Sequence, residues 1–203
     1  MKRALLGLAL LAILPVSAQA AESASPLSYS YIEGSYQNSD WYSENFDGFG
    51  IAGSVAFGDN WYGSASYRSV NNGDIDLDLD ETYVNLGWHH AVSDKADFLA
   101  EIGYVNFNAD AGAVDGNSDG YRIAAGFRGM LAPKFEAGIK ASYVDVSDLD
   151  SEFGIGLNAQ YHFNDTWGLT LSYDHMPRAR KVLPLQGWYV ISLRPLGQHG
   201  PCF

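Results

Sequence analysis

The chain has 203 residues, of which 18% are charged and 14% are aromatic, and it contains 22 glycines. Its formal net charge of −12 excludes nucleic acid as a partner, because phosphate binding needs lysine and arginine, whereas divalent cations or basic partners fit. Soluble domains usually carry about 25% charged residues, so this composition favours a membrane β-barrel. Cys202 is the single cysteine, which excludes an internal disulfide.

Residues 1–20 have the features of a secretory signal peptide. Lys2 and Arg3 precede an apolar run over 4–16, and residues 18–20 read Ala-Gln-Ala, a small-residue cleavage pattern. A membrane helix is the alternative, but the apolar run is shorter than the ~20 residues that spanning requires. Cleavage after Ala20 would leave residues 21–203 as a single barrel domain with a net charge of 10 − 24 = −14.

The remainder of the chain alternates apolar and polar side chains with the two-residue period of β-strands. The clearest case is 152–163, whose odd-numbered positions are apolar and whose even-numbered positions are polar or glycine. In chain order, the ten expected strands are 27–37, 46–57, 61–70, 81–91, 98–107, 121–131, 135–143, 152–163, 167–174 and 187–193.

Short turns alternate with longer polar loops between these strands. The expected turns are 58–60, 92–97, 132–134 and 164–166, and the expected loops are 38–45, 71–80, 108–119, 144–151 and 175–186. This alternation predicts an all-β fold, an up-and-down antiparallel transmembrane β-barrel of about ten strands, with its turns on the periplasmic side.

Aromatic residues flank the short turns, where an interfacial girdle is expected. They are Phe57, Trp61, Phe98, Phe135, Phe163 and Trp167. A soluble β-sandwich or a lipocalin-like barrel is the alternative. Its outer face would be rich in lysine, glutamate and threonine, whereas the polar face here is largely glycine, serine, asparagine and glutamine.

Six charged residues fall on the face that is expected to line the lumen: Glu101, Arg122, Arg128, Glu136, Lys140 and Glu152. Adjacent strands bring such side chains together, and pairing is the least costly way to hold charges away from water. Two interpretations follow, a salt-bridge plug or a narrow porin with a charged constriction. The plug is preferred, because open channels usually have about 16–18 strands.

An acidic run precedes the fourth expected strand. Asp74, Asp76, Asp78 and Asp80 alternate with other residues, which places four carboxylates on one side of an extended ribbon. Such a row could bind a hard cation such as Ca²⁺. It lacks the EF-hand spacing and glycine, so a solvated strand extension is preferred. A second acidic stretch covers 145–152, and divalent cations could bridge both stretches to lipopolysaccharide phosphates.

No pattern in the sequence predicts an enzyme or a cofactor. His89, His90 and His162 are expected near the short turns, away from the outer rim where barrel hydrolases act, and are interpreted as structural or interfacial. The chain has no nucleophile elbow, P-loop or zinc-ligand spacing.

Four segments carry a family resemblance: LSYSYIEGSY at 27–36, DGFGIAGSV at 47–55, DGYRIAAGFRG at 119–129 and AQYHFNDTWGL at 159–169. They resemble the Ax-type family, small proteobacterial barrels within the OmpA- and OmpX-like group that were once proposed as activators of plant immunity and quorum sensing. The resemblance covers roughly residues 1–174. It implies a Gram-negative outer-membrane location, release in vesicles and insertion by the barrel-assembly machinery, and it brings no catalytic residues.

The chain departs from that family pattern after Asp174. Pro195 and Pro201 do not fit a regular central strand, so residues 194–203 are expected to form an irregular tail behind a closing strand. Phe203 supplies the terminal aromatic residue that the insertion machinery reads in such barrels. One hypothesis is that the reading frame diverged after Asp174, and resequencing the gene tests it.

Overall fold

The structure is a computed structural model that describes residues 27–41, 44–72, 77–110, 115–147, 151–164, 167–175 and 186–195. The expected signal peptide, Asp74, Asp76 and most of the expected tail lie outside these residues. Among the residues described, no helix is long and apolar enough to cross a membrane.

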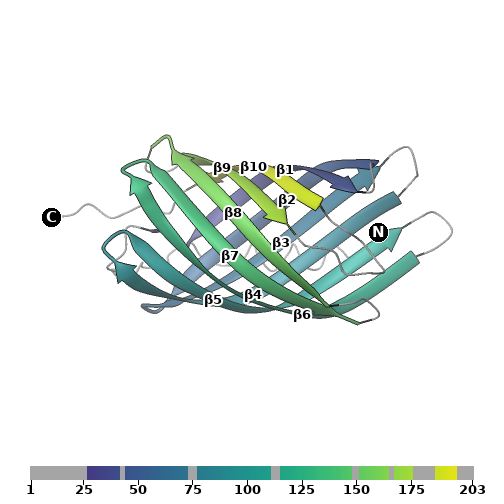
Figure 1. The fold of residues 1–203 in the computed structure, drawn as a ribbon, viewed down its shortest axis with the longest axis horizontal. Coiled ribbons are helices and arrows are strands. Elements are labelled where there is room, and N and C mark those ends of the chain that lie inside the picture. The colour runs from purple at the N-terminus through teal and green to yellow at the C-terminus, as the bar shows by residue number, and fades with distance from the viewer. Residues whose placement is uncertain are drawn as a thin grey trace.

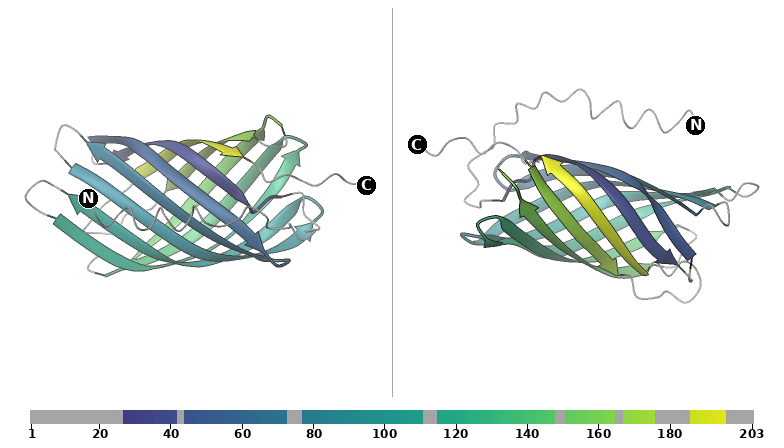
Figure 2. Two further views of the ribbon diagram at one scale, coloured as in Figure 1. Left: turned by 180° about the vertical axis from the view of Figure 1, so that it is seen from behind. Right: turned by 90° about the horizontal axis from the view of Figure 1, so that it is seen from above.

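Ten antiparallel strands follow one another around a closed barrel (Figure 1), which confirms the predicted fold. Each strand pairs with its neighbours in the chain, and β10 pairs with β1 to close the ring. Figure 2 shows from two further directions that the strands run obliquely around a cylinder. The strands are β1 (Tyr31–Trp41), β2 (Glu44–Phe57), β3 (Trp61–Asn72), β4 (Leu77–Ser93), β5 (Ala96–Asp110), β6 (Asp115–Ala132), β7 (Phe135–Val146), β8 (Glu152–His162), β9 (Trp167–His175) and β10 (Gln186–Pro195).

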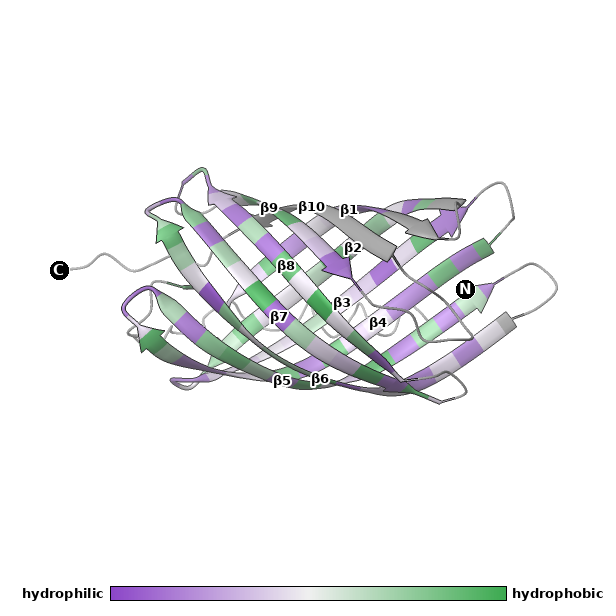
Figure 3. Ribbon diagram, in the orientation of Figure 1, coloured by the Kyte–Doolittle hydropathy of each residue, from purple (hydrophilic) through white to green (hydrophobic). Residues whose placement is uncertain are grey.

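Side chains alternate between the exterior and the lumen along the strands. The hydropathy of successive residues alternates in the same way, as the colours in Figure 3 show. Phe127 and Leu171 are each 52% exposed, whereas their neighbours Arg128 and Thr170 are 8% and 6% exposed. An apolar exterior that surrounds a polar interior is the reverse of a soluble fold, and it suits a barrel surrounded by lipid.

The aromatic residues beside the short turns lie on the exterior, as predicted. Phe57, Trp61, Phe135, Phe163 and Trp167 are all exposed. Phe98 is half-buried because its ring contacts those of Trp88 and Phe127. These rings form a belt at one end of the barrel, where headgroups would meet them.

The largest departure from the predicted elements is at the loop end of β4, β5 and β6. These strands have 17, 15 and 18 residues, so much of the expected loops at 71–80 and 108–119 is strand. Their backbone pairing continues outward, and the amide groups of Asn106, Asn108 and Asn117 bond to one another across β5 and β6. Their polar side chains predict loops, but these residues instead extend a solvated sheet beyond the membrane-spanning part.

Two smaller differences from the predicted elements occur in the first and last strands of the barrel. The first strand begins at Tyr31 instead of residue 27, because residues 27–30 turn into the lumen. The last strand continues to Pro195, two residues into the expected irregular tail. Pro195 is tolerated there because it is the final residue of the strand, opposite Trp167.

Candidate functional site

The barrel lumen contains a cavity of about 370 Å³. One side of its lining is charged and comes from β3, β5, β6 and β7, with Arg68, Glu101, Arg122 and Lys140. The other side comes from β1, β8 and β9, with small polar groups such as Ser35, Asn158, Thr170 and Ser172 and the carboxylates of Glu33 and Asp174. The lining also includes apolar residues such as Leu99 and Leu157, but its charged and polar groups suit the cavity to water or a polar solute.

A central cluster of four residues is centred on the Glu101 carboxylate. It accepts hydrogen bonds from Tyr62 Oη (2.8 Å), Arg122 Nη1 (3.0 Å) and Lys140 Nζ (2.8 Å). These donors come from β3, β6 and β7, so one carboxylate on β5 joins side chains across half of the wall. Two cations and one phenol satisfy a carboxylate that is 7% exposed.

Gly87 makes room for the tyrosine of this cluster. It is the cross-strand partner of Tyr62, and a Cβ atom at Gly87 would lie 2.1 Å from Cζ of the Tyr62 ring. The ring therefore lies over the backbone of β4, where any larger side chain would displace it. Neither residue is predicted from the sequence pattern above, although a lumen-facing glycine opposite a tyrosine is a readable signal.

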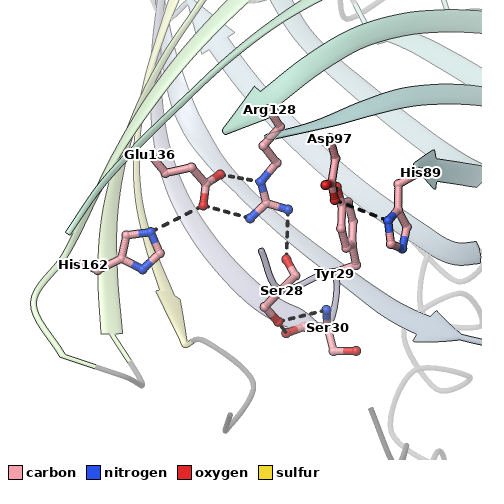
Figure 4. A network of polar contacts seen from close by, with 8 residues as sticks. All are labelled: Ser28, Tyr29, Ser30, His89, Asp97, Arg128, Glu136 and His162. Atoms are coloured by element: carbon pink, nitrogen blue, oxygen red, sulfur yellow. Dashed lines mark hydrogen bonds and ion pairs between the residues drawn. The ribbon is translucent and has the colours of Figure 1, made fainter. Parts of the chain in front are cut away.

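A second group, the short-turn network, lies at the end of the lumen near the short turns (Figure 4). It consists of Tyr29, His89, Asp97, Arg128, Glu136 and His162.

Arg128 and Glu136 form the strongest contact of the short-turn network. Arg128 binds both carboxylate oxygens of Glu136, through Nε and through Nη2 (3.0 Å), and the two side chains are 9% and 1% exposed. His162 Nε2 lies 3.4 Å from the same carboxylate, and Arg128 Nη1 donates to the Ser28 carbonyl (2.9 Å). This bidentate pair is buried and geometrically specific.

Tyr29 forms the other half of the short-turn network. Its hydroxyl donates to Asp97 Oδ2 (2.7 Å), which also lies 3.4 Å from His89 Nδ1, and its ring stacks on that of His89 with centroids 3.9 Å apart. Burial raises the pKa of the Tyr29 phenol, outweighing the opposite effect of Arg128. The phenol therefore keeps its proton and remains the donor to Asp97.

The loop end of the lumen is built differently. Arg68 pairs with Glu81, which also accepts from Tyr83 Oη (3.2 Å). Beyond this pair, two buried apolar clusters line the interior. Their buried members are Phe46 and Val70 in one, and Val105, Val144 and Val146 in the other. Water is thus disfavoured at this end, whereas the centre of the lumen is polar.

The six predicted lumen charges do not form one network. Glu101, Arg122 and Lys140 meet in the central cluster, and Arg128 and Glu136 meet in the short-turn network. The sixth residue, Glu152, is at the start of β8 opposite Val144. Sequence reasoning did not identify Tyr29 and Asp97 of the short-turn network, Tyr62 of the central cluster, or the separate pair of Arg68 and Glu81.

The acidic run is described only in part. Asp78 and Asp80 lie on β4 beside Asp110 and Asn108 of β5. Across the part of the chain that the structure describes, no group of three or more His, Cys, Asp or Glu side chains is placed to hold a metal ion.

The three histidines considered above lie in different surroundings. His89 and His162 belong to the short-turn network inside the barrel. His90 is on the exterior, where its ring stacks on Trp88 with centroids 5.6 Å apart.

A closed barrel with an apolar exterior and an ion-paired polar interior defines the class of transmembrane β-barrels. The sequence profile of the family "Outer membrane protein beta-barrel domain" matches residues 6–159. The chain belongs to this outer-membrane family.

Several solved barrel structures align with most of this chain. The KdgM porin is 9% identical, with 82% of this chain and 99% of that chain covered and a TM-score of 0.46. The NanC porin is 12% identical, with coverage of 83% and 100% and a TM-score of 0.44. The N-terminal barrel domain of Pseudomonas aeruginosa OprF is 9% identical, with coverage of 83% and 98% and a TM-score of 0.38. A search of curated protein sequences finds no match.

Proposed function

We propose that this chain is a structural outer-membrane barrel whose lumen is closed by ion pairs and whose acidic loops interact with the cell surface. The observation that carries the proposal is the central cluster, in which Glu101 joins donors from three other strands. Each of these contacts runs between strands, so together they occupy the interior and stiffen the wall.

The energetics of buried charge favour a closed state over a charged channel. Arg128 and Glu136 are almost fully buried, and separating them would leave two unpaired charges in a poorly solvated place. The pairing of Arg122 and Lys140 with Glu101 lowers the attraction that either cation would have for a passing solute. A lumen organised in this way is better suited to stability than to transport.

A narrow porin is the second candidate, and the cavity of about 370 Å³ favours it. Lys140 is the most exposed partner of the central cluster, with 33% of its side chain accessible. If its contact to Glu101 broke, the cavity would gain a free cation and an anion selectivity.

Single-channel conductance in a planar bilayer separates the two candidates. Residues 21–203 are refolded, and folding is verified by the heat-dependent shift in gel mobility that intact barrels show. Folded protein that gives no current supports the closed barrel. Discrete steps whose size depends on salt would replace that proposal with the porin.

The surface role is proposed from the charge at the loop end of the barrel. Asp47, Asp78, Asp110 and Asp119 are exposed there. Among the residues that the structure describes, no lysine or arginine lies closer to the loop end than Arg68 and Arg122. Divalent cations could link such a rim to lipopolysaccharide phosphates. Binding of the refolded barrel to lipopolysaccharide with Mg²⁺, abolished by a chelator, tests this link, and equal binding in both conditions would contradict it.

The Ax-type resemblance extends the proposal to export by cleavage after Ala20, insertion by the barrel-assembly machinery and release in vesicles. Mass spectrometry of the protein from isolated outer membranes and vesicles tests the first and last points. Recovery of an uncleaved chain, or its absence from vesicles, would contradict them.

A further inference from the structure

Residues 27–30 lie inside the barrel and do not form part of its wall. Leu27 and Tyr29 are 3% and 5% exposed and share an apolar cluster with Tyr62. At the other end of the segment, Ser30 Oγ accepts a hydrogen bond from the Ala56 backbone of β2 (3.0 Å). The segment is therefore held at both of its ends before the chain enters β1.

Tyr29 occupies a pocket to which four strands each contribute one side chain. Its ring contacts those of His89 and Tyr62, at centroid distances of 3.9 and 5.0 Å, and these two rings are 6.2 Å from each other. The Arg128 guanidinium lies 5.0 Å from the ring centroid, and Asp97 accepts the hydroxyl proton at 2.7 Å. Two aromatic faces, a cation and an anionic acceptor together recognise a phenol specifically.

This pocket is part of a chain of contacts across the lumen. Tyr62, His89, Asp97, Arg128, Glu136 and His162 come in order from β3, β4, β5, β6, β7 and β8, one from each strand. Arg128 joins the two halves, because it binds Glu136 on one side and the Ser28 carbonyl on the other (Figure 4). Residues 27–30 thus contact β2 to β6, which is half of the circumference, at the end where the short turns are.

We infer that residues 27–30 are a plug that closes the short-turn mouth of the lumen, and that its pocket is a phenol-binding site filled by Tyr29. The inference rests on the proposed function, because it names the element that shuts one end of the closed barrel. Noncovalent contacts hold the plug in the lumen, and the chain tethers it to the start of β1 at Tyr31. Its withdrawal opens the central cavity to the periplasm and leaves the pocket free for a para-substituted phenol.

The test compares bilayer conductance among the unchanged protein, Tyr29→Ala, Glu101→Ala and the double variant. Glu101→Ala is included because the central cluster could keep the lumen shut after the plug is lost. The plug predicts that the double variant is open at least about tenfold more of the time than Glu101→Ala, since removing a contact that favours one state shifts the population. Adding p-cresol should fill the vacated pocket and reverse this gain.

Tyr36→Ala is the matched control, because Tyr36 is an exposed tyrosine on the exterior of β1 that contacts Phe49. It should change neither conductance nor the response to p-cresol. Tyr29→Phe, which keeps the ring and loses the bond to Asp97, should give an intermediate gain and serves as the test if Tyr29→Ala does not fold.

The outcomes separate the inference from the proposed function. Conductance by the unchanged protein would overturn the closed barrel. In that case, comparing its conductance with that of the Tyr29 variants would still test the plug. Folded Tyr29 variants that conduct like their parents in both backgrounds would overturn the plug. A gain that p-cresol does not reverse would overturn the phenol site.

Discussion

The short-turn network and the central cluster are built from the same kinds of residues in different surroundings. In the first, the side chains of Arg128 and Glu136 are 9% and 1% exposed. In the second, Lys140 reaches Glu101 while 33% of its side chain stays accessible beside the cavity. An identical ion pair costs much more to break where water cannot replace the lost partner. The first group should therefore contribute more to the stability of the closed barrel, and the second should tolerate substitution at a lower cost.

The largest effect should follow from Glu136→Ala, which leaves the Arg128 guanidinium buried without its carboxylate. Removing one partner of a buried pair costs about 3–5 kcal/mol. Urea unfolding of the barrel in lipid vesicles, followed by tryptophan fluorescence, measures this loss. The loss should persist at high salt, because buried pairs are weakly screened. A cost below that of Glu101→Ala would reverse the ranking of the two groups.

Gly87→Ala should give the next largest effect, because the new methyl group would displace the ring of Tyr62. Overpacking of this kind typically costs about 1–3 kcal/mol. Gly34→Ala is a matched control, since a Cβ at Gly34 meets nothing within 4 Å. The same unfolding assay should separate the two variants, and equal stability would mean that Tyr62 moves aside without loss.

Glu101→Ala should cost less than Glu136→Ala, about 1–2 kcal/mol, because water in the cavity can solvate Lys140 once its partner is gone. Its clearer effect should be on ion selectivity, since Arg122 and Lys140 would both be left without the Glu101 carboxylate. Reversal potentials in a salt gradient, measured in the Tyr29→Ala background, should shift toward anions. An unchanged reversal potential would place the ion path elsewhere.

The smallest effect should come from Asp78→Asn at the loop end, and it should have the opposite sign. Asp78 is directly opposite Asp110 across β4 and β5, and like charges in such a position destabilise a sheet. The substitution should stabilise the barrel by about 0.2–1 kcal/mol in a chelator. A loss of stability confined to buffers with Ca²⁺ would instead indicate that the two carboxylates share a cation.

The strands and their lumen faces could be predicted because a two-residue period fixes which side chains face inward. The division of the lumen charges into two groups could not be predicted. It depends on how far each strand is offset along the barrel axis, which the two-residue period does not specify. Lys140 is opposite Gly126 in the sheet, yet its side chain reaches past β6 to Glu101 on β5.

The strand predicted at residues 27–30 does not form, for another reason. Leu27 and Tyr29 continue the alternation of β1, so the pattern predicts a strand there. The backbone nevertheless leaves the wall, because Asp97 and Arg128, distant in the sequence, offer buried hydrogen bonds to Tyr29 and Ser28. Local periodicity contains no information about such partners.

The pairing of β1 with β10 also sets the order in which the barrel can be completed. Gly34 is opposite Leu193, a separation of 193 − 34 = 159 residues, whereas every other pair of strands joins neighbours in the chain. Hairpins of nearby residues form quickly, and contacts of long sequence separation form slowly. The nascent sheet must therefore expose two unpaired edges until its last strand arrives. Any factor that assists assembly would act on those edges, which no longer exist in the finished ring.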